Sequence, residues 1–147
     1  MNNYILKYHD FFRERIIHLT VQVRKIKSTL APEDYKQHET VKLLGRIVRA
    51  SQEIIPQNPN QPDYFLKGSL SKFRRYKQGI KRYRLIFCYS SKPPVIVYLY
   101  INDQDHLRQE GSHNDPYKEF TRLVKSGVFN HNPHAPNMAS RLHDEFE

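Results

Sequence analysis

The run over residues 95–102, VIVYLYIN, is nearly continuous in apolar and aromatic residues. A strand with one face in water alternates polar and apolar residues, whereas this run has no charged position at all. It therefore predicts a central strand that is buried on both faces. Other elements of the chain must cover that strand, and a chain of 147 residues most simply does so as one domain.

Two amphipathic segments lie ahead of this strand. Over residues 10–28, apolar side chains recur at steps of three and four, which predicts a helix with one buried stripe, and Asp10 is a suitable N-cap. A second helix is predicted over residues 32–51, because Pro32 favours a first helical turn and the apolar spacing continues. Its buried face is predicted to hold Val41, Leu44 and Val48. Residues 3–8 alternate and predict a short first strand.

Two more strands and a last helix complete the predicted elements. Residues 73–77 and 82–89 predict strands, and the short connections between them imply antiparallel hairpins. In the second of these strands the side chains predicted to face the helices are Tyr83, Leu85, Phe87 and Tyr89, and those predicted to face away are Arg82, Arg84, Ile86 and Cys88. Asp115 and Pro116 suit the start of a helix that stops at Gly127.

These elements predict an α+β fold. One small antiparallel sheet is packed on one face by the two N-terminal helices, and its opposite, basic face is predicted to stay partly open. Residues 1–129 are expected to form this domain together with the C-terminal helix. Residues 130–147 hold two prolines, three histidines and little periodicity, and they are predicted to form a flexible tail.

The positive charge of the chain is concentrated in one segment. Residues 64–102 contain nine Lys and Arg side chains and no Asp or Glu, and outside this segment the 15 remaining cations equal the 15 acidic residues. Six of the ten tyrosines lie in the same segment. A positive field interleaved with rings that stack on bases is typical of nucleic-acid binding. The alternative is a solvated basic face with no ligand.

Composition excludes several other classes. No window approaches the length of a membrane span, and the first residues lack the features of a signal peptide, so a cytoplasmic protein is expected. A single cysteine, Cys88, excludes internal disulfides and multi-cysteine metal sites, and its apolar surroundings predict a buried thiol. No glycine-rich phosphate loop is present, and we expect no cofactor.

A basic surface of this kind can support two types of RNA cleavage. A metal-dependent nuclease needs grouped carboxylates, for which Asp103, Asp105 and Glu110 are the only candidates, but carboxylates after a strand are more often turn residues. Cleavage without metal uses the ribose 2′-OH as nucleophile and needs proton transfer plus cations on the phosphate. His106 and His113 are possible proton carriers, although both are predicted to be exposed loop histidines.

A family resemblance becomes specific from Arg82 onward. The run YRLIFCYSSKPPVIVYLYINDQDHLRQEGSHNDPYKEFTRLVKSG over residues 83–127 resembles the YhaV-type toxins of bacterial toxin–antitoxin systems, and Arg75, Lys77 and Gly79 fit the same pattern. The resemblance extends roughly over residues 4–133. These toxins belong to the RelE-like superfamily of small ribonucleases, so the resemblance implies the order of elements predicted above.

The resemblance also implies roles for individual residues. It places Arg75 and Lys77 where the superfamily has two basic residues on one strand, and Arg84 where it has an arginine on the next. Arg108 and Tyr117 fall where a phosphate-contacting arginine and a stacking or proton-transferring tyrosine are found. These five residues are therefore the expected catalytic set. The residues expected to bind RNA are Lys67, Lys72, Tyr76 and Arg82.

The expected function is that of a toxin that cleaves mRNA without metal, on or off the ribosome, by 2′-OH attack. Arg75, Lys77 and Arg84 would stabilise the transition-state charge, and Lys77 could also act as base. A cognate PrlF-like antitoxin is the partner that the resemblance implies, and no membrane contact is expected. The alternative is a non-catalytic RNA- or DNA-binding module, because binding uses the same side chains.

Overall fold

A five-stranded sheet in the order β2-β3-β4-β1-β5 forms the centre of the computed structural model, which describes residues 3–146. β4, Pro94–Ile101, is the middle strand, and every residue from Val95 onward is buried. β3, Leu85–Ser91, pairs with it antiparallel, and β1, Ile5–His9, pairs with it parallel. The predicted central strand is confirmed. The predicted all-antiparallel sheet is wrong, because the first strand joins the sheet in parallel orientation.

The two edges of the sheet are short strands. β2, Arg74–Tyr76, pairs antiparallel with β3, and it is shorter than the predicted strand over residues 73–77. β5, Leu142–His143, pairs antiparallel with β1 on the opposite edge. The loop between β2 and β3 spans residues 77–84, so it is longer than the predicted hairpin connection and leaves Arg82 to Arg84 outside the strand.

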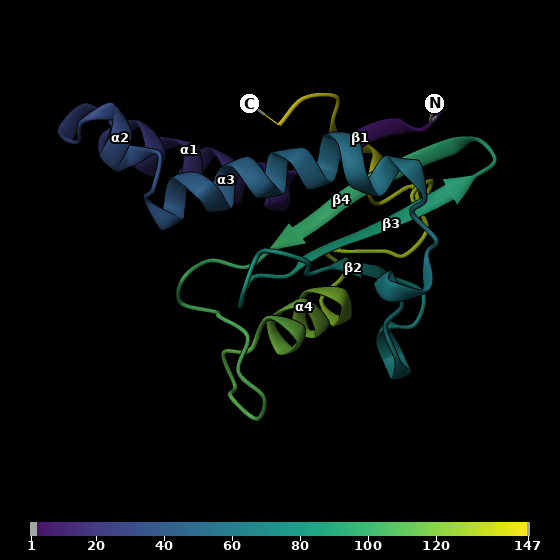
Figure 1. Cartoon of the computed structure of the whole chain (residues 1–147). Helices are drawn as coiled ribbons and strands as arrows, with labels where there is room; N and C mark the ends of the chain where they lie inside the picture. The colour runs from purple at the N-terminus through teal and green to yellow at the C-terminus, as the bar shows by residue number, and fades with distance from the viewer. Residues whose placement is uncertain (1–2, 147) are drawn as a thin grey trace.

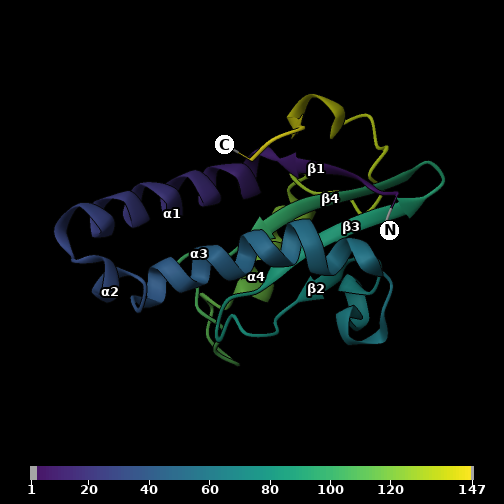
Figure 2. The ribbon, with the colours of Figure 1, turned by 45° about the horizontal axis from the view of Figure 1, so that its top comes forward.

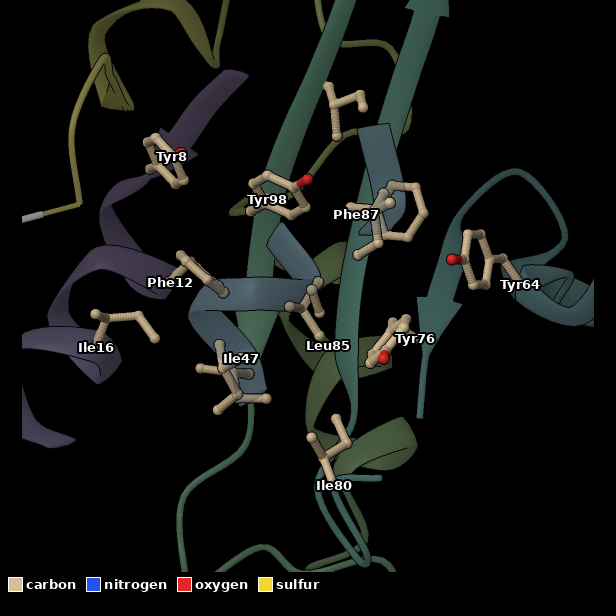
Figure 3. Packing of buried hydrophobic residues seen from close by; sticks show 14 residues of the cluster. Tyr8, Phe12, Ile16, Ile47, Tyr64, Tyr76, Ile80, Leu85, Phe87 and Tyr98 are labelled. Atoms are coloured by element: carbon tan, nitrogen blue, oxygen red, sulfur yellow. The ribbon is translucent and has the colours of Figure 1, made fainter. Parts of the chain in front are cut away.

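Two long helices cover one face of the sheet. α1, Asp10–Thr29, and α3, Glu39–Arg49, run side by side across it (Figures 1 and 2). The core between helices and sheet is rich in aromatic rings, as Figure 3 shows, and its largest members include Phe12, Ile16, Ile47, Tyr64, Leu85, Phe87 and Tyr98. The predicted stripe of the first helix and the inward face of β3 are therefore confirmed.

The helical layer differs from the prediction at two points. The expected second helix is split, because α2 ends after Pro32–Tyr35 and α3 starts only at Glu39, where the His38 side chain accepts a hydrogen bond from Thr40 N. α1 is capped in the same way by His9 rather than by Asp10. After α3 the chain continues as a π-turn, Ala50–Ile54, and a 3₁₀ turn, Ile55–Gln57.

The opposite face of the sheet is covered as well. α4, Pro116–Lys125, packs against it, and Figure 1 shows α4 on the other side of the sheet from α1 and α3. Ile86 and Cys88 are buried against this layer, together with Phe120 and Met138. The prediction of a partly open basic face is therefore wrong: apolar side chains on β3 and β4 fill this face, and the arginines lie only at its edge.

The segment after residue 129 takes part in this second core. Ala135 and Met138 are buried in it, a 3₁₀ turn follows at Ala139–Arg141, and the chain then adds β5 to the sheet. This arrangement differs from the predicted flexible tail. Two further 3₁₀ turns, Pro62–Tyr64 and Gly68–Leu70, connect α3 to β2. No helix within residues 3–146 is long and apolar enough to cross a membrane.

Candidate functional site

Tyr117 lies at the centre of a cluster of arginines beside the edge strand β2. It occupies the first turn of α4, and its hydroxyl is 3.3 Å from Nη1 of Arg75, which comes from β2. Nη2 of Arg75 donates to the backbone oxygen of Asp63 at 2.9 Å, which fixes the guanidinium in this position. The guanidinium of Arg108 lies over the Tyr117 ring, 5.1 Å from its centroid. The structure thus brings together three of the five predicted catalytic residues, although Arg75 is far from the other two in sequence.

Asp115 holds this arrangement in place. Its carboxylate accepts from Nη1 of Arg108 at 2.7 Å, from Gln109 N at 2.8 Å and from Tyr117 N at 3.1 Å. One buried side chain, 4% exposed, therefore caps α4 and orients Arg108 over the tyrosine. Asp115 is the acidic partner of Arg108 only, so the cluster of Arg75, Arg108 and Asp115 keeps an excess of positive charge next to Tyr117.

Asn102 joins the loops that carry the remaining arginines. It is buried directly after β4, where its Nδ2 donates to the backbone oxygens of Arg82 and His106, and its Oδ1 accepts from Arg84 N at 2.7 Å. Arg82 and Arg108 also bond to each other through their backbones and through Nε of Arg82. The loop of residues 77–84 and the loop after β4 are therefore one connected unit.

The other predicted residues are placed less favourably. The Arg84 side chain donates to the backbone oxygens of Lys81 and Tyr83 at 2.6 Å, so it is not part of an open sheet surface with Arg75. Lys77 is exposed just after β2. Exposed positions are also found for Lys67, Lys72 and Arg82. Tyr76 is 7% exposed and packs beside Tyr64 in the core under α3, so its predicted role in stacking on RNA does not fit.

A second polar cluster, which the sequence did not reveal, lies at the end of β4. Arg15 of α1 donates to Ile101 O at 2.8 Å and to Glu119 at 3.2 Å, and it lies 3.4 Å from Asp103. Nδ1 of His106 is 2.7 Å from Asp103, and Nε2 is 3.4 Å from Glu119. His106 is therefore a half-buried residue between two carboxylates and not the exposed loop histidine that was predicted. His113, in contrast, is exposed as predicted.

This second cluster ties α1, β4 and α4 together. The Tyr100 hydroxyl donates to Glu119. Burial is the main cause that raises the pKa of Tyr100, and this neighbouring carboxylate raises it further. Burial acts to raise the pKa of Asp103 too, but the hydrogen bond with His106 and the charge of Arg15 outweigh it and hold that pKa below its ordinary value. The sequence could show only that Asp103 and His106 are three residues apart. Arg15 and Glu119 are distant in sequence and reach this cluster only because α1 and α4 pack at the end of β4.

Asp103, Asp105 and Glu110 were the predicted carboxylates for a metal-dependent reaction. Asp103 is engaged by Arg15 and His106, while the other two are exposed. Across residues 3–146, no group of three or more His, Cys, Asp or Glu side chains is placed to hold a metal ion. The chemistry that the Tyr117 cluster can supply is instead anion binding by guanidinium groups next to a hydroxyl that can transfer a proton.

Comparison with known proteins identifies the class to which this small basic α+β chain belongs. Residues 6–140 match the model of a family described as a toxin with endonuclease activity of a toxin–antitoxin system. The ribonuclease toxin YhaV of Escherichia coli strain K12 is 33% identical over 132 residues, which cover 86% of this chain and 85% of that protein. The toxin YhaV of Escherichia coli O157:H7 gives the same values. No solved structure gives a significant match.

The chain therefore belongs to the YhaV toxin family, the family that its sequence resembled. It is a toxin of a toxin–antitoxin system with endonuclease activity, which argues against the alternative of a non-catalytic RNA- or DNA-binding module. The matched range includes most of the segment after residue 129, which agrees with the packing of that segment in the core.

Proposed function

We propose that this toxin cleaves mRNA without a metal ion, at the surface formed by Arg75, Arg108 and Tyr117, by attack of the ribose 2′-OH on the adjacent phosphate. The observation that carries this proposal is the Tyr117 hydroxyl 3.3 Å from the Arg75 guanidinium, with Arg108 stacked on its ring. The name of the Escherichia coli K12 relative, ribonuclease toxin, supports RNA as the substrate.

Each of these residues has a defined part in the reaction. Arg75 and Arg108 contact the non-bridging oxygens of the scissile phosphate and stabilise the negative charge that grows on them in the transition state. The Tyr117 hydroxyl exchanges a proton with an oxygen of the reacting phosphodiester. Lys77, exposed next to β2, is the proposed base, and its amine accepts the proton of the 2′-OH when it is in the deprotonated form.

The reaction is balanced without any co-reactant. The 2′-oxygen loses its proton to the base and bonds to phosphorus, the bond from phosphorus to the 5′-oxygen breaks, and the leaving oxygen takes up a proton. The products are a 2′,3′-cyclic phosphate and a 5′-hydroxyl. These end groups differ from those of a metal-dependent enzyme that uses water as the nucleophile.

The test is cleavage of mRNA in excess EDTA, followed by analysis of the end groups. The wild type is expected to produce cyclic phosphate ends, and Arg75→Ala or Tyr117→Phe is expected to be roughly 10² to 10³-fold slower. Lys92→Ala is the matched control, because this exposed cation lies at the other end of β3. Activity that EDTA abolishes and Mg²⁺ restores would contradict the proposal and point to Asp103 and Asp105.

Two finer points belong to the same proposal. The toxin acts in the cytoplasm on mRNA, either free or on the ribosome, which a comparison of naked and translated mRNA distinguishes. Its antitoxin is PrlF-like and carries an acidic segment, because a chain of net charge +9 attracts acidic partners. Association with that antitoxin should slow as salt rises from ~0.05 to ~0.5 M, since salt screens long-range attraction.

A further inference from the structure

A groove of about 580 Å³ runs between α1 and α3, the two helices that lie side by side in Figure 2. Val23 of α1 and Val41, Leu44 and Val48 of α3 give it an apolar lining. The helices cover the face of the sheet opposite α4 (Figure 1), so the groove belongs to a different layer of the molecule from the Tyr117 cluster. The proposed cleavage reaction makes no use of it.

The groove is lined by the outer part of a broad apolar face of α3. Ile47 and Ala50 fill the core beneath the helix and are at most 1% exposed. Val41, Leu44, Val48 and Gln52 follow one another at steps of three and four and line the groove as one stripe, with Gly45 beside Leu44. The three apolar side chains of this stripe, which the sequence predicted to be core, are only partly buried. An apolar stripe left partly open along a whole helix fits a second helix.

Gly45 is unusual for its position beside this stripe. Glycine is unfavourable inside a helix, yet no atom lies within 4 Å of the Cβ that a larger residue would carry here, so the described residues give no packing reason for it. A missing side chain on an open groove wall allows another backbone to approach closely. The π-turn Ala50–Ile54 brings Gln52 and Glu53 to the end of the same groove, and such turns are frequent at functional sites.

The charge of the surface indicates which kind of helix fits. Lys27 of α1 and Arg49 of α3 stand on opposite walls of the groove. Glu53, the one acidic residue of the lining, pairs with Arg49 at 3.5 Å, so Lys27 is the cation in excess there. A second copy that docked through this face would add its own Lys27 to the contact, and each chain carries a net charge of +9, so self-association is opposed by like charge. An acidic partner is attracted to it instead.

We propose that the groove between α1 and α3 is the docking site for an acidic amphipathic helix of the cognate antitoxin, with a close crossing at Gly45. This inference rests on the toxin-antitoxin function. The antitoxin helix then binds on the face of the sheet opposite α4, in a different layer of the molecule from the residues proposed to contact RNA. Substitutions in the groove should therefore weaken binding of the antitoxin and leave RNA cleavage by the toxin unchanged.

The experiment compares Gly45→Gln with the control Val21→Gln. Glutamine is a good helix former that extends into the open groove, whereas Val21 is an exposed apolar residue of α1 that does not line the groove. The affinity for the purified antitoxin from the adjoining gene is measured by calorimetry, and RNA cleavage is measured alongside. Gly45→Gln is expected to bind the antitoxin at least roughly tenfold more weakly and to cleave RNA normally. Val21→Gln is expected to match the wild type in both assays.

A charge variant gives an independent readout. Lys27→Glu is expected to weaken binding most at low salt, where the attraction to an acidic helix is least screened. Antitoxin binding by Gly45→Gln at the wild-type affinity would overturn the proposal. A wild-type dimer that Gly45→Gln converts to a monomer would also overturn it, because the groove would then hold a second copy. A wild type that binds the antitoxin but leaves RNA intact would contradict the proposed cleavage and not the docking site.

Discussion

Asp115 is a position where one substitution is expected to disturb both the fold and the candidate site. Its carboxylate accepts three hydrogen bonds, from Arg108, Gln109 N and Tyr117 N, and it is 4% exposed. Asp115→Ala removes the cap of α4 and leaves the guanidinium of Arg108 without its partner. Both the stability of the fold and the geometry around Tyr117 should therefore suffer.

The size of the effect follows from these contacts. Loss of a helix N-cap costs about 1 kcal/mol. Loss of a hydrogen bond to a charged group costs about 1.5–3 kcal/mol. The free energy of unfolding of Asp115→Ala is thus expected to fall by roughly 3 kcal/mol. Asp115→Asn keeps an acceptor for the Tyr117 N–H but loses the charge that faces Arg108, so we expect a smaller loss of about 1–2 kcal/mol.

The assay is urea unfolding of the two variants and of Asp105→Ala, an exposed aspartate in the same loop that is expected to change stability by less than about 0.5 kcal/mol. RNA cleavage is measured on each protein under conditions where it is folded. Asp115→Ala should be slow even then, because Arg108 is no longer held over the tyrosine ring. A loss of stability below about 1 kcal/mol for Asp115→Ala would refute the reasoning.

Three further outcomes are expected. Gly45→Ala should raise the free energy of unfolding by roughly 0.5–1 kcal/mol in a urea titration, because alanine favours the helix and meets open space. The pKa of Asp103 is lowered in the folded state, so its carboxylate stabilises the fold fully above its unfolded-state pKa and loses this effect as the pH falls through its folded-state pKa. The free energy of unfolding of Asp103→Asn should therefore fall less than that of the wild type on acidification below about pH 4. Cys88 should react with a thiol reagent only after unfolding, because burial raises the pKa of its thiol.

The features that the sequence predicted correctly depend on local spacing. The apolar stripe of α1, the uninterrupted strand over residues 95–102 and the Asp115 cap with Pro116 each show their structural role within a few neighbouring residues. The N-caps at His9 and His38 were missed, because histidine is not one of the residues that usually mark a helix start.

The features that were missed depend on contacts between distant segments. Nothing near residue 5 indicates that β1 lies parallel to β4, and nothing near Met138 indicates that it fills a core beneath the sheet. The covered face also changes the site, because Arg84 lies with its own loop instead of on an open surface with Arg75.

The sequence indicated which residues belong to the candidate site better than it indicated how they are arranged. The family pattern singled out Arg75, Arg108 and Tyr117, and the fold brings these three together. Alternation along residues 73–77 puts Tyr76 on the opposite side from Arg75, and the structure has it there, 7% exposed in the core under α3, where the RNA contact expected of it does not fit. Arg15 was not considered, because its role at the end of β4 depends on the packing of α1 across the sheet.

The pairing of β1 with β4 bears on the order in which the molecule folds. It joins Ile5 to Val95, so its formation has to close a very long loop, whereas the helix pair and the β3–β4 hairpin form from neighbouring segments. Short-range contacts generally form first, so the α1–α3 pair and the β3–β4 hairpin should assemble early and the parallel pairing of β1 with β4 late.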